Sequence, residues 1–496
     1  MMSNFLQIHP ADNVAVALAA LCAGSRITVN GASITIKSDI PQGHKLALAP
    51  LQAGDNVIKY GYAIGHAVAD IAQGDWVNEK NIKTNLEGLL EYKYSPVSAK
   101  VSCANRNMTF KGYRRKNGEA GIRNELWVVP TVGCVNGTAN QLVEMLKAEV
   151  GECKLDAIAA YNHSYGCSQL GDDHENTRKI LRNIVLHPNA GAVLVVGLGC
   201  ENNQLEAFRT FLGDYDRERI FFLETQKVKD ELEEGMKLLR ALYAKASADV
   251  RTDVPLSELR VGLKCGGSDG FSGITANPLL GFFSDFLVAQ GGTTVLTEVP
   301  EMFGAETILM SRCCNAEVFD KTVHLINDFK EYFVKNNQPI YENPSPGNKA
   351  GGISTLEEKS LGCTQKSGSS EVKDVLMYGE RIRQKGLNLL SAPGNDLVAA
   401  TALGASGCQM VLFTTGRGTP FGSFVPTVKI STNTPLFQSK PGWIDFNAGS
   451  IVENEAMEDA TERLIAYLTG VANGEKVNTE KKNFREIAIF KTGVTL

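Results

Sequence analysis

The sequence predicts an α/β protein in three parts: a small N-terminal β domain, a middle α/β domain, and a C-terminal domain with a mostly parallel sheet covered by helices on both faces. Strand-like and helix-like segments alternate from about residue 111 to the end of the chain, which is typical of parallel sheets. The first 90 residues instead hold short β-like runs separated by glycine turns. At 496 residues the chain is also too long for one hydrophobic core.

Residues 1–90 are expected to form the β domain. Three short runs share strand composition: residues 26–29, 33–37 and 56–60. A short helix is expected over residues 13–21, with Asp12 as its N-cap. Residues 91–110 are polar and aperiodic, so we interpret them as a linker.

Residues 111–255 are expected to form the middle α/β domain. Apolar runs predict strands at 125–130, 156–161, 191–197 and 219–223. Helical spacing predicts helices at 137–149, 172–185, 203–212 and 228–244. Residues 256–496 form the expected C-terminal domain. Its predicted strands are 260–264, 293–297, 387–390, 410–414 and 428–431, and its main predicted helices are 278–290, 307–313, 318–334 and 396–405.

Composition limits the classes of partner and the compartment. The formal net charge is -5 without any Lys/Arg run, so nucleic acid is not an expected partner. No run approaches 18 apolar residues, so no membrane span is expected. The N-terminus lacks the pattern of a secretory signal, and eleven cysteines, an odd number, argue against a disulfide framework. A cytoplasmic location is therefore expected.

Polar segments follow four of the expected C-terminal strands. They are Cys265-Gly-Gly-Ser-Asp269, Glu298-Val-Pro-Glu301, Ser391-Ala-Pro-Gly-Asn395-Asp396 and Thr415-Gly-Arg417. In open parallel sheets ligands bind outside the carboxyl ends of the strands. Each segment alone is compatible with a tight structural turn. Together they predict one site for a hard metal ion and a substrate that carries a carboxylate.

The segment 341–366 is long, polar and rich in glycine and proline inside a compact domain. Loops of this length are usually functional or disordered, and its varied sequence favours a functional loop over a solvated insertion. The segment holds Lys349, Glu357, Glu358, Lys359 and Cys363.

Histidines mark two further candidate positions. His163 and His174 flank Cys167, Asp172 and Asp173, and this group fits either a helix N-terminus or a cluster for metal binding or proton transfer. Its spacing matches no zinc template. The Gly43-His44-Lys45 turn is compatible with a surface turn or with a positive pair that meets an acidic substrate. Residues 197–203 lack the Gly-x-Gly-x-x-Gly pattern of a nicotinamide site.

Several long blocks resemble one known family, the altronate and galactarate dehydratases, over essentially the whole chain. They include GHKLAL (43–48), RNELWVVPTVGCVNG (123–137), HSYGCSQLGDDH (163–174), KCGGSDGFSGITANP (264–278), NPSPGNKAGGISTLEEKSLGCTQK (343–366) and TTGRGTPFG (414–422). The closing FREIAIFKTGVTL (484–496) resembles the altronate branch.

This resemblance implies properties that periodicity does not. The N-terminal region would be a β-clip domain of the SAF type, the middle domain would help to form a homodimer, and the C-terminal domain would be a Rossmann-like sheet that carries a metal. The reaction would convert D-altronate to 2-dehydro-3-deoxy-D-gluconate and water in hexuronate breakdown, supported by Fe2+ or by Mn2+ in its place. Galactarate or another aldarate or aldonate is the alternative substrate.

Dehydration of an aldonate removes the C2 proton and the C3 hydroxyl, and a divalent ion would stabilise the resulting enediolate charge. A base must take the proton and an acid must protonate the leaving hydroxide. The expected metal ligands are Asp269, Glu298 and Glu301, with Cys265 nearby. Arg417 is expected to bind the substrate carboxylate, and Asp396, Asn395 and Asn348 to bind the rest of the substrate. The candidate bases are Lys349 and Lys359, and the candidate acids are His44, His163 and His174.

Two other interpretations stay open. An iron–sulfur dehydratase would use Cys134, Cys167 and Cys200, or Cys265 and Cys363, although their wide spacing is unspecific. A non-enzymatic protein would bind a sugar acid without turnover. A brown colour would indicate the iron–sulfur dehydratase, and a dehydration assay would separate both enzymes from a sugar-acid-binding protein.

Overall fold

The N-terminal region is a set of short antiparallel strands. A computed structural model of the chain describes residues 4–29, 31–98, 101 and 103–496. One four-stranded sheet has the order β1-β2-β5-β8, strands β6, β7 and β9 form a second sheet, and β3 pairs with β4 in a separate hairpin. The strands are β1 (Phe5–Leu6), β2 (Val14–Ala17), β3 (Arg26–Val29), β4 (Ala32–Thr35), β5 (Lys45–Ala47), β6 (Asn56–Lys59), β7 (Tyr62–Ala67), β8 (Trp76–Val77) and β9 (Ile82–Lys83).

The helix expected over residues 13–21 is wrong, because this stretch contains strand β2. All four residues of β2 are buried, and β2 pairs with β1 on one side and β5 on the other. A short apolar run that is buried on both faces has no alternation, so periodicity alone cannot distinguish it from a buried helix. Asp12 accepts hydrogen bonds from the amides of His9 and Gly61, so it stabilises a turn and not a helix N-terminus.

The described residues between Lys83 and Thr109 form neither helix nor strand. The chain then enters a small antiparallel sheet of order β11-β10-β16, which joins the two ends of the middle region. Its strands are β10 (Thr109–Arg114), β11 (Ala120–Gly121) and β16 (Thr252–Pro255).

The middle region is a four-stranded parallel sheet of order β13-β12-β14-β15. Its strands are β12 (Glu125–Pro130), β13 (Ile158–Ala160), β14 (Ala190–Gly197) and β15 (Ile220–Glu224). Its helices are η1 (Gly133–Val135), α1 (Asn136–Val150), α2 (Gly171–Val185), α3 (Leu205–Leu212), η2 (Thr225–Lys227) and α4 (Glu231–Ala246). Helices α1 and α4 share one hydrophobic core with the sheet, whereas α2 and α3 belong to a second core that continues into the C-terminal region.

The C-terminal region is a seven-stranded parallel sheet of order β19-β20-β18-β17-β21-β22-β23. Its strands are β17 (Arg260–Cys265), β18 (Thr293–Leu296), β19 (Val372–Leu376), β20 (Gly386–Leu390), β21 (Met410–Thr415), β22 (Thr427–Ser431) and β23 (Phe446–Asn447). Its helices are η3 (Leu256–Glu258), α5 (Ala276–Ala289), η4 (Val299–Glu301), α6 (Glu306–Met310), α7 (Ala316–Lys335), α8 (Pro346–Ala350), α9 (Leu356–Thr364), η5 (Gln365–Ser367), α10 (Asp396–Ala405), α11 (Thr434–Ser439), η6 (Gly449–Glu453), α12 (Met457–Ala472) and α13 (Asn478–Lys481). The long loop expected at residues 341–366 thus contains two short helices, α8 and α9.

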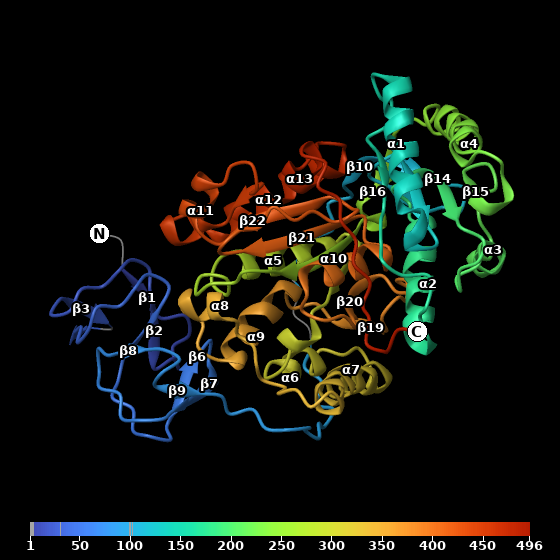
Figure 1. Cartoon of the computed structure of the whole chain (residues 1–496). Coiled ribbons are helices and arrows are strands. Elements are labelled where there is room, and N and C mark those ends of the chain that lie inside the picture. The colour runs from blue at the N-terminus through green and yellow to red at the C-terminus, as the bar shows by residue number, and fades with distance from the viewer. Residues whose placement is uncertain (1–3, 30, 99–100, 102) are drawn as a thin grey trace.

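The C-terminal sheet lies between the other two regions (Figure 1). The N-terminal strands lie beside α8 and α9, and the middle region lies at the far side of the sheet, where α2 contacts α10. The fold class predicted from the sequence, a mixed α/β chain with a large parallel C-terminal sheet, is confirmed. Over the described residues, the helices are all too short or too polar to cross a membrane.

Candidate functional site

A cleft of about 700 Å³ opens at the carboxyl edge of the C-terminal sheet. Strands β20, β18, β17 and β21 are neighbours in this sheet, so the segments that follow them meet along one edge. Three of these four segments line the cleft, together with residues of the 341–366 segment. The predicted site residues among them are Cys265, Glu301, Asn348, Lys349, Lys359 and Asp396.

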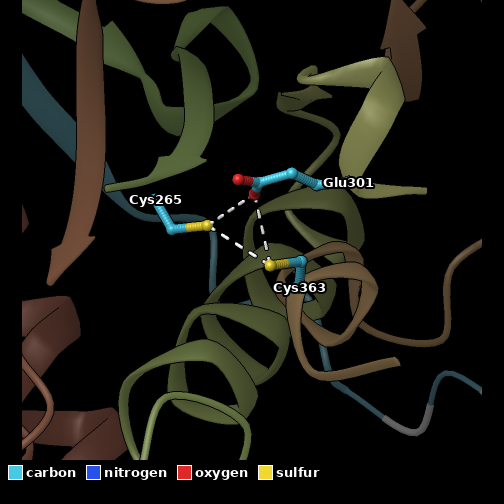
Figure 2. A group of neighbouring side chains, drawn as sticks. All are labelled: Cys265, Glu301 and Cys363. Atoms are coloured by element: carbon cyan, nitrogen blue, oxygen red, sulfur yellow. Dashed lines mark hydrogen bonds between the residues drawn. The ribbon is translucent and has the colours of Figure 1, made fainter. Parts of the chain in front are cut away.

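Three buried side chains from three elements converge (Figure 2), and two of them, Cys265 and Glu301, line the cleft. Cys265 ends β17, Glu301 lies in η4, and Cys363 lies in the last turn of α9. The Cys265 Sγ lies 3.0 Å from Glu301 Oε2 and 3.4 Å from the Cys363 Sγ. The Cys363 Sγ lies 3.3 Å from the same carboxylate oxygen. Among the described residues this is the one group of three closely spaced metal-ligating side chains.

Two lysines surround this group. Lys366 Nζ lies 2.8 Å from Cys265 Sγ, and Lys359 Nζ lies 2.8 Å from Glu301 Oε1. Burial disfavours charge on Glu301, but the ammonium groups of Lys359 and Lys366 outweigh burial and lower the pKa of its carboxyl. Burial also opposes the charge of Lys359, yet Glu301 and the two thiols raise its pKa above the usual value. Lys359 and Glu301 are therefore a charged pair at neutral pH.

The donor set fits a divalent metal ion. A tetrahedral ion about 2.3 Å from sulfur and about 2.1 Å from oxygen needs ligand atoms about 3.6–3.8 Å apart. The three observed separations, 3.0, 3.3 and 3.4 Å, are slightly shorter, so a small outward movement of the side chains opens such a site. The ammonium of Lys366 lies beside Cys265, and the thiolate is the form of cysteine that binds metals.

Glu298 lies behind this group and is buried. Its Oε1 accepts a hydrogen bond from Lys264 Nζ at 3.0 Å and its Oε2 accepts one from the Cys265 amide at 2.9 Å. Burial and the neighbouring Glu301 raise the pKa of Glu298. Its backbone has a φ of 70°, in the left-handed region that is strained for a glutamate. Glu298 was expected to bind metal, and the structure places it next to the candidate ligands, outside the cleft lining.

Asp396 reaches the cleft from the first turn of α10. Its Oδ1 accepts a hydrogen bond from Lys264 Nζ at 2.6 Å, so one buried lysine joins Asp396 to Glu298. The adjacent Asn395 caps α10, because its Oδ1 accepts from the amides of Leu397 and Val398. Asn395 was expected to bind substrate, and in the structure this cap occupies its side-chain carbonyl.

Three other predicted residues stabilise the loops around the cleft. Asn348 Nδ2 donates to the Ser268 carbonyl at 2.8 Å. Asp269 is half-buried and lies outside the cleft lining, where it accepts from the hydroxyls of Thr432 and Ser272, and desolvation of its carboxyl raises its pKa. Arg417 is exposed, and its Nη1 lies 3.4 Å from the Gly347 carbonyl, again outside the lining.

The candidate histidines do not join the cleft. His44 lies in the N-terminal region, where its Nδ1 accepts from Trp76 Nε1 and its Nε2 lies 3.2 Å from the Ala350 carbonyl. His163 is buried in the middle region, with Nε2 2.8 Å from the Pro130 carbonyl. His174 lies on α2. Burial lowers the pKa of all three imidazoles, so they are neutral at pH 7.

Two buried lysines of the site, Lys264 and Lys366, were not predicted from the sequence. Cys363 was named as a ligand only in the iron–sulfur alternative. Lys264 had a readable signal, since it is a charged residue inside an apolar strand. Lys366 and Cys363 lie in the segment expected to be functional, but their direction depends on α9 and η5, which the sequence analysis did not predict. The other alternative thiols, Cys134, Cys167 and Cys200, are exposed at the middle sheet.

Comparisons with known proteins agree along the whole chain. Three family models match consecutive regions: the altronate/galactarate dehydratase SAF domain at residues 3–85, the D-galactarate dehydratase/altronate hydrolase second domain at 112–247, and the D-galactarate/altronate dehydratase C-terminal domain at 256–495. The chain is 60% identical to the altronate dehydratase of Bacillus subtilis (strain 168) over all of both chains. It is 56% identical to the altronate dehydratase of Escherichia coli (strain K12) over 99% of this chain and 100% of that one. It is 34% identical to the galactarate dehydratase (L-threo-forming) of the same organism over 95% and 93%. The chain therefore belongs to the altronate/galactarate dehydratase family.

Proposed function

We propose that this protein dehydrates D-altronate to 2-dehydro-3-deoxy-D-gluconate and water, as a step of hexuronate breakdown. The observation that carries the proposal is the identity of 60% and 56% to two altronate dehydratases over essentially complete chains. The cleft supports it, because metal-ligating, acidic and cationic side chains face one space of about 700 Å³, large enough for a six-carbon acid.

Cys265, Glu301 and Cys363 would hold the divalent ion, and two sulfur donors favour Fe2+ over Mn2+, which prefers oxygen ligands. When bound, the ion would supply positive charge that stabilises the enediolate formed from the substrate carboxylate and C2. The Lys366 ammonium, 2.8 Å from the Cys265 Sγ, would offset the negative charge of a metal-bound thiolate.

The remaining cleft residues would divide the proton transfers. Lys359 is held charged by Glu301, so it suits the role of acid: its Nζ would donate a proton to the leaving C3 hydroxyl. This role replaces the base expected from the sequence. Lys349, which also lines the cleft, is then the candidate base for the C2 proton. Asp396, oriented by Lys264, would accept a hydrogen bond from a sugar hydroxyl.

A substrate panel tests the proposal. The protein is incubated anaerobically with Fe2+ and a thiol reductant, and 2-keto acid formation is measured with D-altronate, with galactarate, and with a chelator added. We expect turnover of D-altronate that the chelator abolishes. Preference for galactarate would identify an aldarate dehydratase, and binding without turnover would identify a sugar-acid-binding protein. Broad visible absorption that is lost together with activity would favour an iron–sulfur cluster.

We also propose a cytoplasmic homodimer that pairs through the middle region. Thiol ligands at Cys265 and Cys363 need reducing conditions, which supports the compartment. Pairing rests on the family resemblance. Light scattering on the purified protein measures the mass, and a value near 53.6 kDa, that of one chain, would contradict it.

A further inference from the structure

The N-terminal region binds helix α9, which carries two of the site residues. Helix α9 presents Glu357 and Glu358 to the N-terminal strands, and it presents Lys359 and Cys363 to the candidate metal site. Residues i and i+4 of a helix lie on one face, as Lys359 and Cys363 do. Figure 1 shows α8 and α9 next to β6 and β7.

We propose that Lys45 and Lys59 are positioning residues for the metal site: by binding Glu358, they hold α9 where Lys359 and Cys363 meet Glu301 and Cys265. This inference rests on the metal site of the proposed function. It gives the N-terminal region a role in assembling the site without contact with substrate.

The ion group between the regions is short and fully buried. Lys45 Nζ lies 2.8 Å from Glu358 Oε2, and Lys59 Nζ lies 2.7 Å from Glu358 Oε1. The side chains of all three are at most 1% exposed. Burial alone would raise the pKa of Glu358, but the two ammonium groups outweigh it and lower that pKa to about 2. Moving α9 away from the N-terminal region would leave these buried charges without partners, so the group disfavours other arrangements of the helix.

Further hydrogen bonds join the N-terminal region to the segment that leads into α9 and to the start of the helix. Lys45 Nζ also donates to the Gly352 carbonyl at 2.8 Å and to Ser354 Oγ at 2.9 Å. Thr355, the N-cap of α9, donates its hydroxyl to the Ile64 carbonyl of β7. Glu357 accepts from Thr84 Oγ1 at 2.8 Å. The start of α9 is thus bound by the N-terminal region at successive positions, and its last turn reaches the metal site.

Matched variants test this role. Glu358→Gln removes the carboxylate that both lysines bind. Glu480→Gln is the control, because Glu480 is also buried, joins two regions and faces two arginines, Arg123 and Arg485, away from α9. The double variant Lys59→Met/Glu358→Gln removes one positive and one negative charge, so the net charge of the group is unchanged. It therefore tests the loss of the contact without leaving an additional uncompensated charge that could cause misfolding. Co2+ is the metal probe, read by its thiolate charge-transfer absorption, and hydrogen exchange of residues 356–364 is measured on the metal-free protein.

We expect both Glu358 variants to bind Co2+ about 10- to 100-fold more weakly than the wild type, since partners that orient ligands have effects of this size. The amides of α9 should also exchange faster in both variants, whereas Glu480→Gln should match the wild type in both measurements. Wild-type Co2+ affinity and exchange in the Glu358 variants would overturn the inference, as would equal losses in Glu480→Gln. If the wild type itself bound no Co2+, the proposed metal site would fail, while exchange of α9 would still report whether the N-terminal region holds it.

Discussion

The middle and C-terminal sheets share one architecture but differ in what they bury at their carboxyl edges. Both are parallel, and both have cysteines at or beyond the carboxyl ends of their strands. At the middle sheet the three thiols, Cys134, Cys167 and Cys200, are exposed. At the C-terminal sheet Cys265 and Cys363 are buried together with Glu301 and two lysines.

Parallel-sheet topology alone therefore does not identify the site. The rule for parallel sheets points to both carboxyl edges equally. A cluster of buried charges of both signs distinguishes the C-terminal edge, because removing several ions from water costs free energy that folding must offset elsewhere. The C-terminal edge holds Lys264, Lys366, Glu298 and Glu301 within contact distance of one another or of Cys265. Groups with perturbed pKa values concentrate at functional sites, and at the C-terminal edge Glu298, Glu301, Lys359 and Lys366 shift one another's pKa values through their charges.

The largest expected effect comes from a substitution at the carboxyl edge of the C-terminal sheet, and it is compared with a matched substitution at the middle sheet. Glu301→Gln should abolish metal-stimulated turnover of D-altronate, because it removes a candidate ligand and the partner of Lys359. Folding should persist, since the amide occupies the same volume. The assay is 2-keto acid formation with and without Fe2+, with circular dichroism as the check on folding.

Glu201→Gln is the matched control at the middle sheet. Glu201 is also buried at a carboxyl edge, where its Oε1 accepts from Thr131 Oγ1 at 2.7 Å. This variant should keep turnover within about twofold of the wild type. Full activity of Glu301→Gln, or loss of activity in Glu201→Gln, would break the assignment of the site to the C-terminal sheet.

A smaller loss is expected at Lys359, whose proposed role is to protonate the leaving hydroxide. Lys359→Met should lower kcat about 10²- to 10⁴-fold, the usual contribution of a general acid. Lys359→Arg keeps the positive charge and should retain more activity. The decisive comparison is kcat at equal iron content, measured for each variant beside the wild type. Turnover by the Met variant within twofold of the wild type would remove Lys359 from the proton transfer.

Sequence reasoning located the cleft better than it located the ligands. Apolar runs and helical spacing found the central strands of both sheets, because buried strands have a strong signal. Cys265 and Glu301, which the structure brings together, could be named from the sequence because each lies at a strand end or shortly after one. Lys366 was missed because η5 fixes its direction, and short helices without a strong apolar stripe leave little trace in the sequence. His44 and Asp269 were plausible by residue type, but their hydrogen bonds to neighbouring segments are visible only in three dimensions.

The buried group at Glu358 predicts a stability effect of a few kcal/mol that disappears in acid. Glu358 has a folded pKa of about 2, below the usual 4.5 for a glutamate, so its contribution to stability is present above about pH 4.5 and is lost as the pH falls towards 2. A shift of this size corresponds to about 3 kcal/mol. The urea midpoints of the wild type and Glu358→Gln should therefore differ at pH 7 and converge near pH 2–3. A constant difference over this range would show that the carboxylate is not stabilised by its lysines.

The smallest expected effect comes from substituting the exposed cysteines of the middle sheet. The triple variant Cys134→Ser, Cys167→Ser and Cys200→Ser changes only exposed side chains of the middle sheet, and such substitutions usually alter stability by less than about 0.5 kcal/mol each. Its iron content and kcat/KM should match the wild type, whereas Cys363→Ser, one thiol at the other sheet, should bind iron about 10- to 100-fold more weakly. Metal analysis and the D-altronate assay measure both. If the triple variant lost its iron while Cys363→Ser kept it, exposure would be the better guide to the metal than buried charge, and the site would belong to the middle sheet.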